Sequence, residues 1–296
     1  MEAIKRIHHI SAIVGDPREN LRFYEGILQL RLVKQTVNFD DPETYHLYYG
    51  NEEAAVGTTI TFFPWSTTNR GRVGSGQVGR IAFRIPKGSI GYWNERLTTN
   101  NVEFNISRLF QAPTIEFTDS HGLALALVED SVEKETPHIL GFHGTVLLSS
   151  KPNQTVSTLQ DDLGLVLKEE TETAYHLLTV GKEQHHIVVP KEVMPRGRFG
   201  VGTVHHIAWS VPDDEDHREW QDYLYDAGYG VTEIKNRQYF NAIYFVEKGD
   251  IVFEVATDGP GFAINESFET LGEKLMLPPQ FESMRDYLES HLPPLR

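Results

Sequence analysis

Apolar and polar residues alternate along the chain in one pattern that occurs four times. The pattern opens on an apolar run typical of a β-strand, found as IHHISAIV at 7–14, VGRIAFRI at 78–85, GFHGTVLL at 141–148 and VHHIAWSV at 204–211. Successive spacings of 71, 63 and 63 residues separate the aligned positions His9, Arg80, His143 and His206. Because self-similarity at a nearly constant spacing indicates a repeated structural unit, we interpret the chain as four copies of one module.

Each apolar run leads into the same series of further elements. An amphipathic stretch follows it, as at 17–28 and 213–228, and in the last module Asp213 and Gly228 are typical of a helix start and a helix stop. Three shorter β-rich runs complete the module. In the last copy these are VTEIKNR, YFNAIYFVE and IVFEVAT, with a turn at 248–250 between the final two. The sequence therefore predicts an α+β protein built from four βαβββ modules.

The segments between modules are rich in polar residues, glycine and proline, which marks them as linkers. They lie near 65–77, 129–140 and 190–202. We therefore expect modules one and two within residues 1–136 and modules three and four within 137–257. The remaining residues, 258–296, break the pattern and are expected to form a C-terminal tail with a closing helix at about 280–291.

Composition limits the classes of partner and cofactor. The net charge of −15 disfavours nucleic acid and an anionic membrane as partners, because phosphate binding requires a basic face. We find no pattern of a signal peptide and no apolar stretch long enough to span a membrane, so we expect a cytoplasmic protein. The chain contains no cysteine, which excludes disulfides, thiolate metal sites and cysteine nucleophiles. Any metal ion must therefore bind to histidine, aspartate, glutamate or tyrosine.

Two His-His pairs, His8-His9 and His205-His206, occupy the same position in modules one and four. Neighbouring side chains of a strand point to opposite faces, so we expect only one histidine of each pair to face a given site. Glu254 lies in the apolar run IVFEVAT, where a carboxylate is costly unless it is paired or binds a metal. Two imidazoles and one carboxylate form the facial triad typical of non-haem iron(II) oxygenases, which leaves coordination positions open for substrate and dioxygen.

Two alternatives stay open at this point. In the first, the His pairs are ordinary hydrogen-bonded strand residues and Glu254 pairs with an arginine; a further pair, His185-His186, shows how little one pair alone indicates. In the second, His143 replaces His9, so that the consecutive modules three and four form the site. The repeated His-His-Ile sequence of modules one and four favours His9, and that assignment requires these two modules to pack against each other.

Seven short motifs carry a resemblance to a known family. They are IHHI at 7–10, YHLYYG at 45–50, GFH at 141–143, VHHIA at 204–208, NRQYF at 236–240, FEVAT at 253–257 and LPPQF at 277–281. With the repeated modules, they resemble the vicinal oxygen chelate superfamily of glyoxalases, bleomycin-resistance proteins and dioxygenases. Within it, nearly the whole chain is similar to the hydroquinone-type ring-cleaving dioxygenases. The resemblance implies that the modules pair into two half-barrel domains.

The resemblance also implies a site. Its metal ligands are the second histidine of each pair and the glutamate, here His9, His206 and Glu254. The residues implied around the substrate are His8, Ser11, His205, Arg237 and Tyr244. Ser11 stands where the family pattern has threonine, and the hydroxyl is kept. The implied cofactor is Fe(II), or Mn(II) on the same ligands, and the implied partners are a small aromatic substrate and O2.

Three functions remain to be separated. The first is extradiol-type cleavage of hydroquinone-like diols by a dioxygenase. The second is a glyoxalase-like lyase or isomerase, which would ordinarily have a second carboxylate as a fourth protein ligand. The run TTITFFPW at 58–65 contains no acid at the expected place, near Thr61 and Phe62, which favours oxygen chemistry. The third is a metal-free protein that binds a small aromatic. The sequence is compatible with more than one ring-substituted diol, with more than one cleavage position and with a homo-oligomer.

Overall fold

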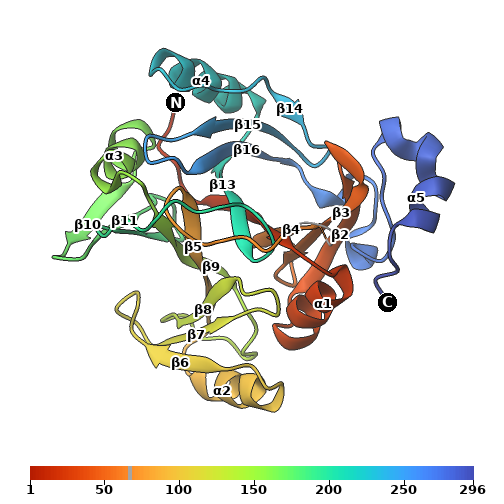
Figure 1. Ribbon diagram of the computed structural model, residues 1–296, viewed down its shortest axis with the longest axis horizontal. Helices are drawn as coiled ribbons and strands as arrows, with labels where there is room; N and C mark the ends of the chain where they lie inside the picture. Colours follow the sequence, from red (N-terminus) through yellow and green to blue (C-terminus); the bar gives the residue numbers. More distant parts are fainter. Residues whose placement is uncertain (66–68) are drawn as a thin grey trace.

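The chain forms two eight-stranded sheets (Figure 1). The computed structural model describes residues 1–65 and 69–296. The first sheet has the strand order β14-β15-β16-β13-β1-β4-β3-β2 and consists of β1 (Ile7–Val14), β2 (Arg31–Asn38), β3 (Asp41–Gly50), β4 (Thr59–Pro64), β13 (Thr203–Val211), β14 (Lys235–Asn236), β15 (Phe240–Val246) and β16 (Val252–Pro260). The second has the order β10-β11-β12-β9-β5-β8-β7-β6 and consists of β5 (Gln77–Ile85), β6 (Phe104–Ser107), β7 (Thr114–Thr118), β8 (Ala124–Glu129), β9 (Gly141–Leu148), β10 (Val166–Glu170), β11 (Ala174–Leu178) and β12 (His186–Pro190).

Helices occupy one position in each module and the end of the chain. The α-helices are α1 (Pro17–Leu21), α2 (Ile90–Thr99), α3 (Pro152–Ser157), α4 (Asp214–Asp226) and α5 (Arg285–His291). A π-helical turn extends α1 over Arg22–Ile27 and another extends α3 over Thr158–Asp162, and short 3-10 turns lie at Phe262–Ile264, Phe268–Thr270 and Pro279–Met284. The predicted α+β class and the four βαβββ modules are confirmed. No helix in the described part of the chain is long and apolar enough to cross a membrane.

The two sheets combine modules that are not all neighbours in sequence. β1 of module one pairs antiparallel with β13 of module four, and β5 of module two pairs antiparallel with β9 of module three. Within each module the first and last strands are parallel neighbours, as β1 and β4 are. Residues 1–136 and 137–257 therefore each contribute one module to each sheet, and Figure 1 shows the red and blue ends of the chain in one sheet.

Local sequence signals account for the best-defined helix. The side chain of Asp213 accepts hydrogen bonds from the backbone N–H groups of Glu215 and Asp216, which caps the N-terminus of α4. Gly228 has a φ of 86°, a left-handed conformation that glycine adopts without steric cost, so the helix ends there. The predicted helix start and stop are confirmed. The strand expected from VTEIKNR is reduced to β14; before it, Thr232 donates its backbone N–H to the Tyr244 carbonyl, and its hydroxyl accepts the Tyr244 N–H.

The C-terminal tail runs beside β2, the edge strand of the first sheet. Gln35 connects the two, since its side chain donates to the carbonyl of Gly272 and its own carbonyl accepts from Met276 at 2.9 Å. Next to it, the Lys34 ammonium forms an ion pair with Glu266, and these side chains are only 0% and 5% exposed. Burial lowers the pKa of Lys34, which the Glu266 carboxylate opposes. A buried ion pair thus fixes the tail to the sheet.

Replacing Lys34 with methionine is expected to lower the free energy of unfolding by about 3–5 kcal/mol, because Glu266 then keeps a buried charge without its partner. Urea denaturation measures this. Lys87→Met is the matched control: its ion pair with Glu133 is exposed, and its loss should cost less than about 1 kcal/mol. The double variant Lys34→Met/Glu266→Gln should recover most of the stability. Equal effects of the two lysine substitutions would contradict this account of the tail.

Candidate metal centre

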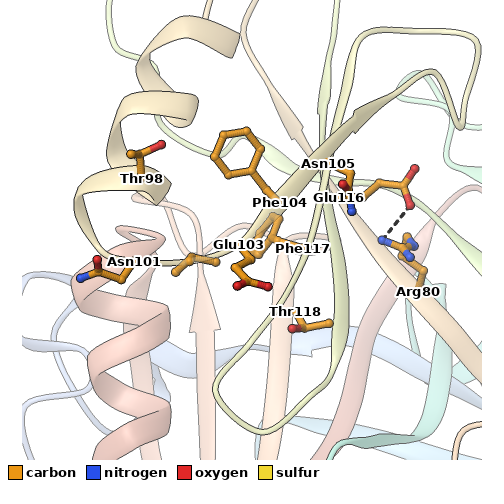
Figure 2. Close-up of a pocket in the computed structure, with 10 residues that line it drawn as sticks. Arg80, Thr98, Asn101, Glu103, Phe104, Asn105, Glu116, Phe117 and Thr118 are labelled. Carbon is orange, nitrogen blue, oxygen red and sulfur yellow. Dashed lines mark ion pairs between the residues drawn. The ribbon is translucent and has the colours of Figure 1, made fainter.

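One cavity lies beside the second sheet and lacks the predicted ligands. It has a volume of about 780 Å³ and is formed by α2 and the neighbouring β-strands of module two (Figure 2). Arg80, the counterpart of His9 in the sequence repeat, forms an ion pair there with Glu116 at 2.9 Å. His143 in β9 instead stacks on His186, with ring centroids 4.4 Å apart. In the second sheet, Arg80 and His143 therefore each contact a neighbouring side chain of the same sheet instead of forming a metal site together.

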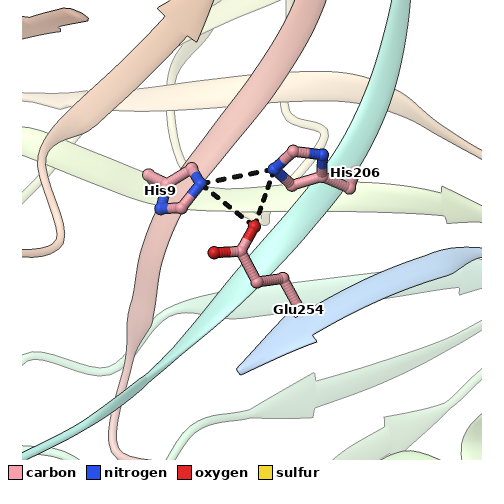
Figure 3. Close-up of side chains that lie close together, drawn as sticks. All are labelled: His9, His206 and Glu254. Carbon is pink, nitrogen blue, oxygen red and sulfur yellow. Dashed lines mark hydrogen bonds and ion pairs between the residues drawn. The ribbon is translucent and has the colours of Figure 1, made fainter. Parts of the chain in front are cut away.

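Three ligand-type side chains converge in the first sheet (Figure 3). His9 lies on β1, His206 on β13 and Glu254 on β16, three adjacent strands. The Nε2 atoms of the histidines are 3.3 Å apart. Glu254 Oε2 lies 3.4 Å from His9 Nε2 and 2.9 Å from His206 Nε2. Among the described residues this is the one group of three or more His, Asp or Glu side chains with ligand atoms this close together.

Each His-His pair contains a β-bulge. In the β1–β13 register, Ile7 faces Trp209 and His9 faces Ala208, so His8 is an extra residue, and the same irregularity occurs at His205. Strict alternation is lost, and both members of the module-four pair line one cavity. The expectation that only one histidine of each pair faces the site is therefore wrong for module four, because a bulge redirects the side chain.

In each pair, the first histidine lies within hydrogen-bond distance of the Nδ1 atom of the second, which is the candidate ligand. His8 Nδ1 and His9 Nδ1 are 2.8 Å apart, and His205 Nδ1 and His206 Nδ1 are also 2.8 Å apart. A proton shared at this position by Nδ1 of His9 or His206 leaves the Nε2 lone pair of the same ring for a metal. The first histidine of each pair thus orients the second.

Glu254 is fully buried, and its carboxylate lacks donors. Neither carboxylate oxygen has a hydrogen-bond partner among the described residues, although His206 Nε2 approaches Oε2 to 2.9 Å. Burial alone would raise the pKa of Glu254, but the imidazoles of His9 and His206 lower it well below the usual glutamate range. A buried carboxylate whose oxygens face two imidazole nitrogens fits a divalent metal, the group that satisfies all three at once.

A second cavity, of about 310 Å³, opens beside these three residues. It is lined by His9, Asn38, Phe39, Asp40, Asp41, His46, Tyr48, Phe63, Trp65, His205, His206, Arg237, Phe240 and Tyr244. Of the residues expected around a substrate, His205, Arg237 and Tyr244 line it. Ser11 and His8 are buried outside the lining, and the Ser11 hydroxyl is hydrogen-bonded to that of Thr61 at 2.7 Å. The cavity has room for a single aromatic ring.

Arg237 and Tyr244 act as one unit at the cavity wall. The guanidinium Nε donates to the Tyr244 hydroxyl oxygen at 3.2 Å, and its centre lies 5.4 Å from the centroid of the tyrosine ring. Burial, with the nearby Glu254 charge, raises the pKa of Tyr244 well above its usual value. Tyr244 therefore keeps its proton and can donate it to a bound oxygen atom, while Arg237 supplies a fixed positive charge.

Comparison with known sequences decides the family. A sequence model described as the Glyoxalase/Bleomycin resistance protein/Dioxygenase superfamily matches residues 6–127 and 114–265. The chain belongs to this superfamily. The predicted membership of the vicinal oxygen chelate superfamily is thereby confirmed, and its half-barrel fold agrees with the two eight-stranded sheets described above.

Individual members of the superfamily resemble the chain over nearly its whole length. The "Putative ring-cleaving dioxygenase MhqO" of Bacillus subtilis (strain 168) is 49% identical over 300 residues, which cover 97% of this chain and 96% of the relative. The "Chlorohydroquinone/hydroquinone 1,2-dioxygenase" of Sphingobium indicum is 25% identical over 308 residues, which cover 97% of this chain and 95% of that relative. A crystal structure of a "putative dioxygenase" from Bacillus subtilis superposes with a TM-score of 0.96, at 47% identity, over 100% of this chain and 99% of the other.

Several residues that line the 310 Å³ cavity were not predicted from the sequence. His46 lines it with both ring nitrogens engaged, Nδ1 by the Tyr48 hydroxyl at 2.8 Å and Nε2 by the Thr61 hydroxyl at 2.9 Å. Burial and the neighbouring His9 hold the pKa of His46 well below its usual value. The spacing of His46 and Tyr48 in YHLYYG places both on one face of a strand, which was the available signal. Asp40 gave none, because it resembles any polar turn residue.

Proposed function

We propose that the protein is a metal-dependent ring-cleaving dioxygenase of hydroquinone-type diols, with Fe(II) held by His9, His206 and Glu254. The convergence of these three side chains beside a cavity lined by aromatic residues carries the proposal. The names of the relatives support the reaction class, since they include ring-cleaving and hydroquinone dioxygenases. Mn(II) takes the same ligands and remains the second choice of metal.

The ligand count supports oxygen chemistry over isomerisation. Three protein ligands would leave coordination positions open for a diol and O2, as in the facial triad. A fourth protein ligand of the glyoxalase type would be expected from β4, which pairs with β1. That strand, Thr59–Pro64, contains no acid.

The reaction needs no reductant beyond the diol. One diol and one O2 combine: a ring C–C bond and the O–O bond break, and two new C–O bonds form. When bound, the metal supplies Lewis acidity and holds both reactants together. Within the cavity, His205 is the side chain whose Nε2–H can donate a hydrogen bond to a substrate oxygen, because its Nδ1 accepts from His206. Tyr244 can donate to a substrate oxygen, and Arg237 stabilises negative charge beside it.

Anaerobic purification followed by loading with Fe(II) or Mn(II) tests the function. Hydroquinone or methylhydroquinone should then consume one O2 per diol, and no O2 should be taken up by the metal-free protein. Turnover of an α-ketoaldehyde–thiol adduct without oxygen, with nickel, cobalt or zinc preferred, would instead establish a glyoxalase-like lyase. Tight binding of the diol with no turnover under any metal would establish a binding protein.

His205→Leu is expected to lower kcat by about 100-fold at saturating metal, the usual cost of losing one hydrogen-bond donor to charge that develops on the substrate. His8→Leu is the matched control, because His8 contacts the ligand His9 as His205 contacts His206 but does not line the cavity. It should retain most of kcat. Oxygen-electrode kinetics with metal analysis of each variant measure both effects. An equal loss of kcat in the two variants would show that the histidines act only by orienting the ligands.

A further inference from the structure

The two edges of the first sheet meet at the mouth of the candidate cavity. β14 and β2 are the edge strands of this sheet. Arg237 lies between β14 and β15, and Asp40 lies in the turn between β2 and β3. Arg237 Nη2 is 2.9 Å from Asp40 Oδ2, so an ion pair between modules four and one spans the seam where the edges approach each other.

The turn that carries Asp40 is held in place by its neighbours. The backbone N–H of Asp40 donates to the side-chain oxygen of Asn38 at 3.0 Å. The carboxylate of Asp41 accepts from the indole N–H of Trp65 at 3.0 Å and from the Thr44 hydroxyl at 2.8 Å. Asp40 and Asp41 both line the cavity, while the Asp40 side chain is 66% exposed. The ion pair therefore contributes little to stability.

The charges at this mouth oppose an anionic ring substituent. Arg237 is the one Lys or Arg among the described residues that line the cavity, and its guanidinium already faces Asp40 and Tyr244. The second carboxylate, Asp41, adds another negative charge there. An arginine without such a partner would bind a carboxylate through two hydrogen bonds. Because Asp40 is paired with Arg237, a carboxylate on the substrate ring reaches Arg237 only by displacing Asp40. It is also repelled by the Asp40 charge at short range.

We propose that Asp40 is a specificity-determining residue that restricts the enzyme to diols with uncharged rings by occupying Arg237. The inference rests on the proposed function for its substrate class. The selection works against the wrong substrate rather than for the right one, which is a common source of specificity. Uncharged substituents such as methyl or halogen do not compete with Asp40 for Arg237.

Asp40→Asn tests the inference by comparing two diols that differ only in a carboxylate, hydroquinone and 2,5-dihydroxybenzoate. In the Fe(II)-loaded protein, the ratio of kcat/KM for hydroquinone to that for 2,5-dihydroxybenzoate should fall by about tenfold in the variant, the effect of one charge close to the ligand. Glu53→Gln is the matched control, because Glu53 is an exposed acid of module one outside this cavity. It should leave the ratio unchanged. A ratio that is unaltered in Asp40→Asn, or altered equally in Glu53→Gln, would overturn the inference.

Binding of benzoate and phenol to the metal-free protein, measured by calorimetry, separates this inference from the proposed function. The affinity for benzoate relative to phenol should rise by about tenfold in Asp40→Asn, since neither metal nor turnover is needed. If the wild-type protein fails to consume O2 with hydroquinone, the proposed function is wrong, and the affinity ratio still decides the role of Asp40. An unchanged affinity ratio would show that Asp40 does not select by charge.

Discussion

Glu254→Gln is expected to abolish metal binding and to reduce oxygen uptake with hydroquinone by roughly a thousandfold or more, because the bound metal would lower the activation free energy by several kcal/mol. Glu254 provides the one carboxylate of the triad, and it is completely buried, so no nearby acid among the described residues replaces it. A neutral amide keeps the shape of the side chain but is a much poorer ligand. Metal analysis after anaerobic loading and desalting measures the loss directly.

Thermal unfolding gives a second measure of the same change that requires no substrate. Metal at 100 times its Kd should stabilise the wild-type protein by about 2.7 kcal/mol, and it should not stabilise the variant. Glu247→Gln is the matched control. Glu247 is a buried glutamate of module four whose carboxylate accepts from the Thr155 hydroxyl and the Ile251 N–H. The Glu247→Gln protein should retain full metal occupancy. Full occupancy in Glu254→Gln would contradict the proposed ligand set.

His9→Ala is expected to lose bound iron, whereas His143→Ala is expected to retain it. The two histidines occupy equivalent positions in the first strands of modules one and three, so each substitution is the control for the other. His9 Nε2 lies 3.4 Å from Glu254, while His143 packs between Phe110 and His186 in the other sheet. Removal of His143 should lower stability by about 1–3 kcal/mol through lost packing and leave the metal in place. Iron per chain, measured after anaerobic loading, decides between them. Iron retained by His9→Ala and lost by His143→Ala would show that the metal lies elsewhere.

The sequence predicts the module and two of the three candidate ligands more firmly than the third. His206 and Glu254 belong to one module, and β13 and β16 are parallel neighbours, so the repeat alone brings them together. The position of His9 relative to the other two ligands depends on which modules share a sheet. The spacing of the repeats does not predict this pairing of distant modules. The structure has β1 next to β13. The His-His-Ile sequence repeated in modules one and four was the local signal that pointed to this arrangement.

Other features of the site depend on how segments far apart in the chain pair. A β-bulge at His8 or His205 follows from how β1 and β13 pair, and alternation along one strand cannot reveal it. Asp40 and Arg237 are about two hundred residues apart and meet only because the sheet curls until its edges approach. His46 has a sequence counterpart in His176, where YHL recurs at 175–177, but that residue lies on β11 of the second sheet. The role of His46 depends on Thr61 and Tyr48, which the fold brings to its two ring nitrogens.

Reaction of the Fe(II)-loaded protein with methylhydroquinone under ¹⁸O₂ tests the central claim most directly. Mass spectrometry of the product should show a ring-opened compound that carries oxygen from ¹⁸O₂, with one O2 consumed per diol. His206→Ala and Glu254→Ala proteins should form none of it. Formation of a quinone without labelled oxygen, or equal formation of the labelled product by the His206→Ala or Glu254→Ala protein, would contradict ring cleavage at this metal centre.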